Sequence, residues 1–274
     1  MFKGTLKTTG ALLIAAAMLA GCKGSPDTAD QQLIDQIIEE NGLEEQTTTA
    51  AAPEISDWLA DVDIHNFISP EPGEKIAVMT VKDYGEIKIK LFPEDAAKGV
   101  ENFIGLAEMG YYDELIFHRV IPDFMIQGGD PKGNGTGGHS IWGDSFEGGT
   151  SENLYHFTGA VAYANSGATS TNGSQFYIVN TDDGFTTNSC EELHLYDPES
   201  YNWPGNVAEL YREKGGVPFL DGGYTVFGQV FEGMDVVRAI AQVETNQDDS
   251  NGVPMDKPLT PVIIESVRIV EYNE

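Results

Sequence analysis

Basic residues and cysteines are scarce in this sequence. It has 274 residues, of which 44 are aspartate or glutamate, 15 are lysine or arginine and 2 are cysteine, and its formal charge is −29. A chain this negative repels phosphate backbones, so we expect no nucleic-acid partner. The apolar fraction of 41% is that of a globular protein, and the 31 glycines favour a turn-rich β fold.

Motifs for metals and dinucleotides are also missing. The five histidines show no H-E-x-x-H or other metal-ligand spacing, so we expect neither a metal nor a cofactor. Residues 133–138 satisfy G-x-G-x-x-G, but a dinucleotide site needs this pattern between a buried strand and a helix. Here Pro131 precedes it and a polar, glycine-punctuated stretch follows, which indicates a loop.

The N-terminal apolar stretch, 10–20, is too short to span a membrane and follows Lys3 and Lys7, a pattern typical of a secretory signal. The Leu-Ala-Gly-Cys sequence that ends at Cys22 resembles the bacterial lipobox. The resemblance implies cleavage before Cys22, its lipidation, and anchoring on the extracytoplasmic face of the cell membrane. An ordinary secretory signal with a chance cysteine is the alternative. With Cys22 lipidated, Cys190 has no disulfide partner and is interpreted as a packing residue.

We expect a signal at 1–21, an acidic tether and transition segment at 22–73, and a compact domain at 74–272. Alternating apolar residues predict a hairpin over 76–81 and 85–91. Further strands are expected at 117–120, 125–127, 160–164, 175–179, 226–230 and 262–270, with helices from Pro93 to about Gly110 and over 234–241. Short strands with two helices predict a mainly β fold, a closed antiparallel barrel capped by two helices.

The stretch 117–130 places Arg119 and Gln127 among large apolar side chains. Such placement is costly unless both side chains face a groove and find partners there. The alternative is a structural arginine whose head reaches solvent.

Four separated segments resemble the signature of the cyclophilin family. They are F-H-R-V-I-P-D-F-M-I-Q-G-G-D at 117–130, G-T-G-G at 135–138, N-G-S-Q-F at 172–176 and F-L-D-G-G-Y-T-V-F-G at 219–228. The resemblance implies an eight-stranded antiparallel barrel closed by two helices, with a peptide groove on its outer face. It also implies peptidyl-prolyl cis–trans isomerase activity on X-Pro segments.

Matched position by position, Arg119 corresponds to the catalytic arginine of the family, and Gln127 to the glutamine that orients the arginine and the substrate carbonyl. Phe124, Met125 and Leu220 match the walls of the proline pocket, and Tyr177 its floor. The remaining matches are Asn165, whose backbone grips the peptide, Ala164, Gln175 and Gly135 along the adjoining groove, His118 at its edge, Tyr224 at the rim, and Phe219 as a further substrate-binding position.

Three of these positions depart from the best-known members of the family. Phe219 stands where many have tryptophan, Tyr224 where they have histidine, and Tyr177 where they have phenylalanine. The tyrosine at the pocket floor needs a hydrogen-bond partner or a water for its hydroxyl. An insertion at 181–216, with helical character over 207–214, is interpreted as a lid or side wall of the groove; a surface ornament is the alternative.

The function expected from this resemblance is a monomeric isomerase that assists the folding of exported proteins outside the cytoplasmic membrane. It needs no cofactor, because an arginine that hydrogen-bonds the proline nitrogen binds the twisted amide better than either planar state. The alternative function is a non-catalytic module that binds proline-containing peptides.

Overall fold

The computed structural model describes residues 58–181, 189–248, 252 and 255–273. These residues belong to one compact unit, Asp57–Glu274, which begins before the boundary at residue 74 that the sequence pattern predicts. The predicted signal, Cys22 and the tether up to residue 57 lie outside the described residues. No helix in the described part of the chain is long and apolar enough to cross a membrane.

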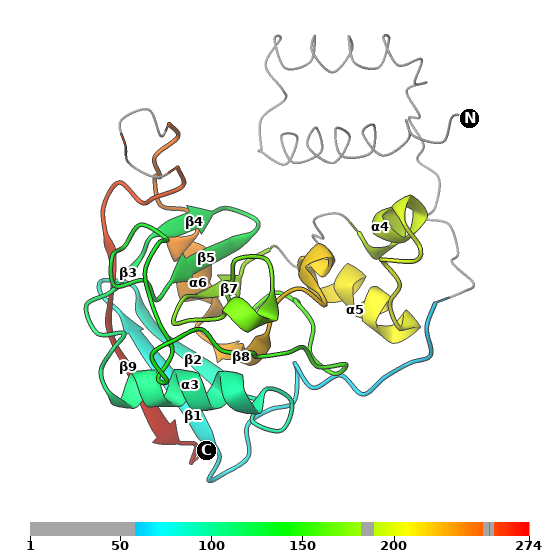
Figure 1. Cartoon of the computed structure of the whole chain (residues 1–274), viewed down its shortest axis with the longest axis horizontal. Helices are drawn as coiled ribbons and strands as arrows, with labels where there is room; N and C mark the ends of the chain where they lie inside the picture. Colours follow the sequence, from blue (N-terminus) through cyan, green and yellow to red (C-terminus); the bar gives the residue numbers. More distant parts are fainter. Residues whose placement is uncertain (1–57, 182–188, 249–251, 253–254, 274) are drawn as a thin grey trace. The chain divides into compact units, whose positions relative to one another are not determined.

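The centre of this unit is a single antiparallel sheet whose strands follow the order β3-β9-β1-β2-β8-β6-β7-β5-β4 (Figure 1). The two end strands, β3 and β4, are separated in the chain only by His118. Because consecutive residues cannot lie far apart, the sheet curls until its ends meet and forms a nearly closed barrel. The strands are β1 (Lys75–Val81), β2 (Gly85–Leu91), β3 (Ile116–Phe117), β4 (Arg119–Ile121), β5 (Met125–Gly128), β6 (Ala160–Tyr163), β7 (Phe176–Val179), β8 (Val226–Glu232) and β9 (Val262–Glu271).

The mainly β fold is confirmed, with nine strands where eight are expected. The expected strand at 117–120 is divided at His118, because Phe117 pairs with Val262 of β9 whereas Arg119 pairs with Gln127 of β5. The other expected strands, the hairpin and both capping helices are present within a few residues of their predicted bounds.

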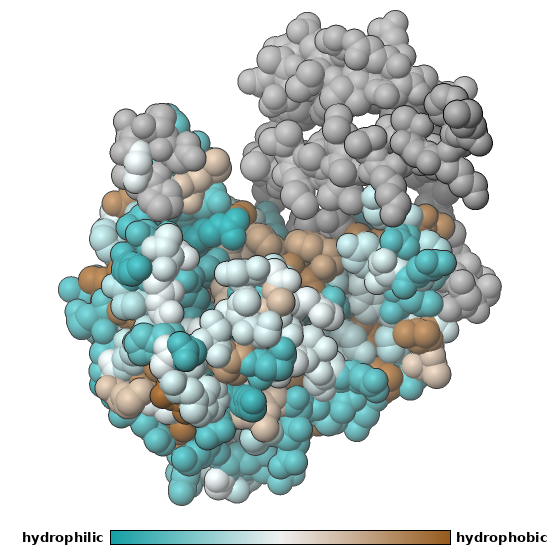
Figure 2. Space-filling view, in the orientation of Figure 1, coloured by the Kyte–Doolittle hydropathy of each residue, from teal (hydrophilic) through white to brown (hydrophobic). Residues whose placement is uncertain are grey.

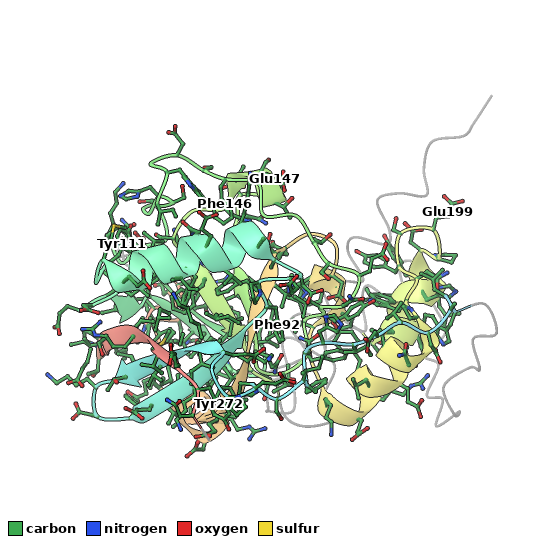
Figure 3. All side chains as sticks on the ribbon, turned by 90° about the horizontal axis from the view of Figure 1, so that it is seen from below. Phe92, Tyr111, Phe146, Glu147, Glu199 and Tyr272 are labelled. Carbon is green, nitrogen blue, oxygen red and sulfur yellow. The ribbon has the colours of Figure 1, made fainter. Side chains whose placement is uncertain are left out.

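Alternation along β1 fills the barrel interior. Ala77, Met79 and Val81 are buried, and they pack with buried residues of β2 and β9 and with α3 (Ala97–Glu108). Phe103 of α3 contacts the rings of Phe176 and Phe227 at centroid distances of 5.8 and 5.0 Å. The second capping helix is α6 (Met234–Ile240). In Figure 3, α3 crosses one end of the barrel, and Tyr111 lies just beyond its C-terminal end.

The described part of the insertion contains α4 (Cys190–Tyr196) and α5 (Gly205–Lys214). Ser189 and Glu192 begin α4 with a capping box. The insertion packs against residues 58–69, and we call these two segments together the flank. Leu59 accepts a hydrogen bond from Gly205 N and donates one to the carbonyl of Trp203.

An apolar cluster joins the flank to the neighbouring barrel segment that holds Phe157. Phe157 and Tyr211 lie in contact at 4.4 Å between ring centroids, and Trp203 and the buried Cys190 belong to the same cluster. Burial raises the pKa of the Cys190 thiol well above its usual value, in keeping with a packing residue. Outside this cluster, hydrophilic side chains cover most of the barrel face visible in Figure 2.

Candidate functional site

A cavity of about 220 Å³ opens on the outer face of the barrel beside β4 and β5. We call it the central cavity. The β4–β5 register sets Arg119 directly opposite Gln127, so both side chains lie on the same face of the sheet. Its lining residues all belong to the set matched from sequence, and they are Arg119, Phe124, Met125, Gln127, Ala164, Asn165, Tyr177, Leu220 and Tyr224.

The Gln127 amide is held by a chain of hydrogen bonds. Its Nε2 donates to Oε1 of Gln175 at 3.0 Å. The Gln175 Nε2 in turn donates to the carbonyls of Gly135 and Gly137 at 3.0 and 2.8 Å. Because Gln127 uses its N–H in this chain, its carbonyl oxygen is left to accept from Arg119 or from a peptide N–H. Gln175 and Gly135 thus act behind the central cavity and line a second cavity.

The second cavity, of about 320 Å³, adjoins the first, and we call it the turn cavity. Gln127, Ala164 and Asn165 line both. Its outer wall is the turn 133–138, which is organised by the buried carboxylate of Asp130. Burial would raise the pKa of Asp130, but hydrogen bonds from backbone N–H groups of residues 132–137 hold it below its usual value. A side chain at Gly137 would collide with Asp130, because an added Cβ would lie 2.2 Å from its Oδ1.

The apolar side of the central cavity is built from three elements. Met125 comes from β5, Tyr177 from β7, and Leu220 from the short helix η2 (Pro218–Leu220). Phe219 does not line the cavity itself. Its ring stacks on Phe124 at 5.9 Å and 26°, so it supports the cavity wall from the flank side.

Tyr177 lies at the cavity floor with its hydroxyl buried and without a hydrogen-bond partner among the described residues. Its ring is 5% exposed, and burial raises its pKa well above the ordinary value, so the hydroxyl is neutral. The Tyr224 ring meets Tyr177 edge-on at 5.8 Å and forms the rim. Asn165 ties this rim to β6, since its Nδ2 donates to the carbonyl of Gly223 at 2.9 Å.

His118 lies behind the arginine and is not a lining residue of the central cavity. It is 4% exposed, and neither ring nitrogen has a hydrogen-bond partner among the described residues. Burial lowers the pKa of His118, so the ring is neutral near pH 7 and adds no positive charge beside Arg119.

Sequence matching did not find Asp256. Its carboxylate lies 3.5 Å from Nε of Arg119, and its backbone carbonyl accepts from Val120 N at 2.8 Å. The loop before β9 that carries Asp256 belongs to none of the matched motifs. A lone aspartate there gives no sequence signal, so only the folded chain reveals this contact.

The insertion contributes nothing to the central cavity among its described residues; they line a neighbouring cavity instead. Within the described ranges no group of three or more histidine, cysteine, aspartate or glutamate side chains could hold a metal ion. The central cavity therefore offers one guanidinium, the two hydrogen-bonded amides of Gln127 and Asn165, and an apolar pocket. This set can bind a ring and stabilise a hydrogen-bond acceptor beside it, without a nucleophile or general base.

Comparison with known proteins gives the same picture. The family model described as cyclophilin type peptidyl-prolyl cis-trans isomerase/CLD matches residues 76–269. A Staphylococcus aureus protein named as a peptidyl-prolyl cis-trans isomerase is 44% identical over 197 residues, which cover 72% of this chain and 93% of that protein. A Streptococcus pyogenes protein named as a bifunctional phosphatase/peptidyl-prolyl cis-trans isomerase is 45% identical over 201 residues, but this chain spans only 39% of its length.

Solved structures are similar as well. A cyclophilin-type isomerase of Cryptosporidium parvum, crystallised in the presence of the dipeptide Ala-Pro, superposes with a TM-score of 0.54 and 27% identity. The match covers 72% of this chain and 99% of that one. A second structure of the same protein gives a TM-score of 0.55 and 28% identity, over 73% of this chain.

Proposed function

Because the chain belongs to the cyclophilin-type peptidyl-prolyl cis–trans isomerase family, we propose that it isomerises X-Pro bonds of exported proteins, with Arg119 as the catalytic hydrogen-bond donor. Isomerase activity follows from the family model and from the relatives that carry that name. The observation that carries the role of Arg119 is its place on the rim of the apolar central cavity, opposite Gln127.

Rotation about an X-Pro bond is slow because amide resonance gives the C–N bond partial double-bond character, with a barrier of about 20 kcal/mol. Twisting the bond by about a right angle breaks this resonance and pyramidalises the proline nitrogen. That nitrogen then accepts a hydrogen bond, which it cannot do in either planar state. The Arg119 guanidinium stays charged and planar, and its donation stabilises the twisted state selectively.

The rest of the site supports this step. Phe124, Met125 and Leu220 hold the proline ring by apolar contact while the acyl group rotates. The Gln127 carbonyl, turned by its bond to Gln175, is available to accept from Arg119 and fix the guanidinium. A charged hydrogen bond contributes about 1.5–3 kcal/mol. The apolar contacts with the proline ring must therefore supply part of the remaining stabilisation of the twisted state.

The direct test is turnover of a short peptide with one X-Pro bond by the full chain and by Arg119→Ala. We expect the substitution to lower kcat/KM by roughly 10- to 150-fold, which corresponds to the loss of one charged hydrogen bond. Lys98→Ala, an exposed basic residue on α3, should leave kcat/KM unchanged. Arg119→Ala with wild-type turnover would overturn the assignment, and a folded wild type without acceleration would favour a binding module for proline peptides.

The N-terminal sequence carries the cellular part of the proposal. A short apolar stretch followed by the lipobox-like sequence at Cys22 favours export, lipidation and anchoring on the outer face of the cytoplasmic membrane. There the clients would be unfolded or loop-exposing exported chains, whose slow prolyl bonds limit folding. The chain would act as a monomer, because one chain supplies every side chain of the central cavity.

Labelling of the expressed full chain with radioactive palmitate, followed by membrane fractionation, tests this part. Wild type should carry label and sediment with membranes, whereas Cys22→Ser should carry none and be released. Cys190→Ser serves as the matched control, because Cys190 is buried in the flank. Equal labelling of wild type and Cys22→Ser would overturn the anchor, and the turnover test would remain independent of that result.

A further inference from the structure

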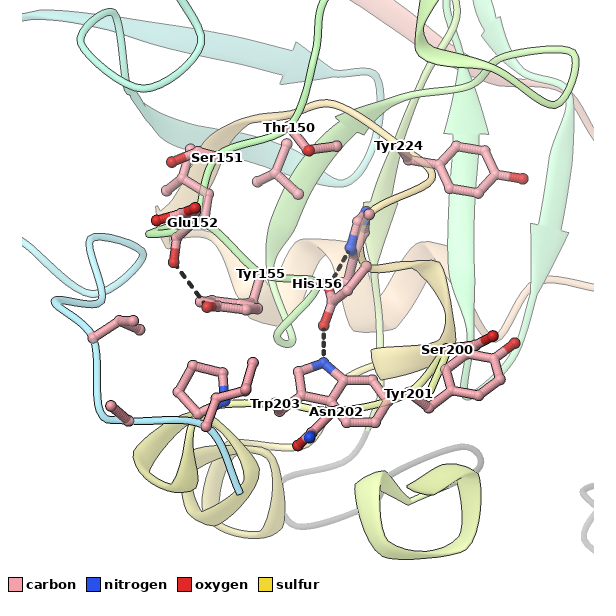
Figure 4. A pocket seen from close by; sticks show the side chains of 18 residues that line it. Thr150, Ser151, Glu152, Tyr155, His156, Ser200, Tyr201, Asn202, Trp203 and Tyr224 are labelled. Atoms are coloured by element: carbon pink, nitrogen blue, oxygen red, sulfur yellow. Dashed lines mark hydrogen bonds and ion pairs between the residues drawn. The ribbon is translucent and has the colours of Figure 1, made fainter. Parts of the chain in front are cut away.

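A third cavity, of about 460 Å³, lies between the flank and the barrel, and we call it the flank cavity. Its walls come from residues 59–62, from the loop 200–204 of the insertion, and from two barrel segments, 150–156 and 221–226. In Figure 4, Thr150 and Glu152 lie along one side and Tyr201, Asn202 and Trp203 along the other. The insertion is therefore one wall of a preformed cavity rather than an ornament.

The flank cavity adjoins the central cavity. Tyr224 lines both of them, with its ring at the rim above Tyr177. An extended peptide advances about 3.3–3.6 Å per residue. A peptide whose proline occupies the central cavity can therefore place a side chain a few residues away in the flank cavity.

The charged side chains among the described residues that line the flank cavity are two carboxylates, those of Glu152 and Asp221. Glu152 is an exposed residue of the wall. His156 also lines this cavity, and its Nδ1 lies 2.7 Å from Oδ1 of Asp221. No lysine or arginine occurs among the described residues that line this cavity.

Aromatic rings complete the walls. Tyr201 stacks on Trp203 at 6.0 Å and 16°, and Trp203 is fixed in turn by a hydrogen bond from its Nε1 to Asp221 at 2.8 Å. Fixed aromatic faces beside a carboxylate favour a cation, above all a planar guanidinium that stacks and donates in several directions. The apolar side chains of Leu59 and Val62 suit the methylene stem of such a residue.

We propose that the flank cavity binds an arginine side chain of the client peptide, a few residues from the proline held in the central cavity. The inference rests on the proposed isomerase function and deepens it, because it names a charge preference for the clients. Glu152 forms the ion pair with the guanidinium, and Tyr201 supplies the stacking face. The strongly acidic chain, with its formal charge of −29, attracts basic clients towards this site.

A peptide series tests the proposal with the full chain. Each peptide carries one X-Pro bond and one arginine, placed from two to six residues before or after the proline, and is compared with the same peptide carrying citrulline or norleucine there. Exchange NMR reads cis–trans interconversion directly, and fluorescence anisotropy reads affinity. We expect arginine at one of these positions to raise kcat/KM and affinity roughly tenfold over citrulline, an effect that added salt weakens.

Glu152→Gln should remove most of the advantage of arginine over citrulline. Tyr201→Ala should lower the affinity of the arginine peptide and of the citrulline peptide alike, because citrulline stacks on the ring but carries no charge. Urea unfolding midpoints near that of wild type would show that both variants are folded. Glu199→Ala is the matched control, since Glu199 projects from the insertion away from the barrel in Figure 3. Absence of an arginine preference at every position, or equal losses in Glu152→Gln and Glu199→Ala, overturns the proposal. If the chain turns over no peptide, fluorescence anisotropy still shows whether the flank cavity prefers arginine. The isomerase proposal and the arginine proposal can therefore fail independently.

Discussion

Asp130 and Asp221 are both enclosed carboxylates that accept several hydrogen bonds, but their donors come from very different places. Asp130 accepts from the backbone N–H groups of Lys132, Asn134 and Gly135, all within five residues of it. Asp221 accepts from the backbone N–H and Nδ1 of His156 and from two side chains of the insertion, Nε1 of Trp203 and Oη of Tyr211. The first carboxylate shapes one local turn, whereas the second joins its own segment to the insertion and to the barrel segment that holds His156.

The difference shows how the two sides of the groove are held. The turn beside Asp130 forms from contiguous sequence; Gln175 donates to its carbonyls, and Gln127 donates to Gln175. The opposite side depends on Asp221, which directly follows the cavity wall residue Leu220 and fastens the insertion to it. Substitutions at the second carboxylate should therefore disturb more of the molecule than substitutions at the first.

Asp221→Ala should have the largest effect on stability. The substitution leaves the buried donors of His156, Trp203 and Tyr211 without their acceptor, so we expect the free energy of unfolding to fall by about 3–5 kcal/mol. Urea unfolding followed by tryptophan fluorescence measures the change. Glu199→Ala, an exposed acid of the same insertion, should cost less than about 0.5 kcal/mol. A loss below about 1 kcal/mol at Asp221 would mean that the insertion is held by its apolar cluster alone.

Asp130→Asn should cost less, about 1–3 kcal/mol, because the amide keeps one acceptor oxygen and only the local turn is disturbed. Since the folded-state pKa of Asp130 lies below its unfolded value, its ionised form stabilises the fold above the unfolded pKa, and this contribution is lost as the pH falls through the folded pKa. The loss of unfolding free energy in Asp130→Asn should therefore be largest at pH 7 and become smaller below about pH 4. Urea unfolding at a series of pH values measures it.

Asp144→Asn is the control for Asp130→Asn, because Asp144 is exposed in the segment that follows the same turn. It should change stability little at any pH. If the loss of stability in Asp130→Asn stays constant down to pH 3, the charge of Asp130 does not cause it. The altered hydrogen-bonding geometry of the side chain would then be the cause.

The contrast between the two carboxylates also separates what the sequence predicts from what it does not. Strands, both capping helices and the residues around the central cavity follow from alternation and from contiguous motifs, and the Asp130 turn lies within such a motif. The division of the expected 117–120 strand cannot be predicted in this way, because it depends on pairing between Phe117 and β9, a strand that begins only at Val262. Local propensity carries no information about which distant strand will be the partner.

The packing of the flank on the barrel could not be predicted from the sequence, for the same reason. Residues 58–69 look like a polar transition segment, yet Asn66 is 1% exposed and bonds the carbonyl of Tyr155 and Oε1 of Gln229. Helical character in the insertion was predictable, but its anchoring on Asp221 was not. Contacts between single side chains of distant segments leave no periodic trace in a sequence.

Asp256 provides a third carboxylate, with a single and longer contact. Its oxygen lies 3.5 Å from Nε of Arg119, and both side chains are partly exposed, so the ion pair is weak. We expect Asp256→Asn to lower kcat/KM by about two- to fivefold, because the guanidinium loses one of its restraints. Asparagine tolerates the positive φ of 62° at this position, so the backbone should not change. Unchanged kcat/KM together with unchanged salt dependence would show that Asp256 does not position Arg119.

The Tyr177 hydroxyl completes the series, since it is buried with no described partner at all. Tyr177→Phe removes a polar group whose burial is uncompensated, so stability should stay the same or rise by up to about 1 kcal/mol. Turnover of a short X-Pro peptide should remain within about twofold of wild type, because the ring that forms the cavity floor is kept. Urea unfolding and exchange NMR on the same samples give both values. A loss of stability instead would mean that an ordered water satisfies the hydroxyl, and a loss of turnover alone would mean that the hydroxyl contacts the bound peptide.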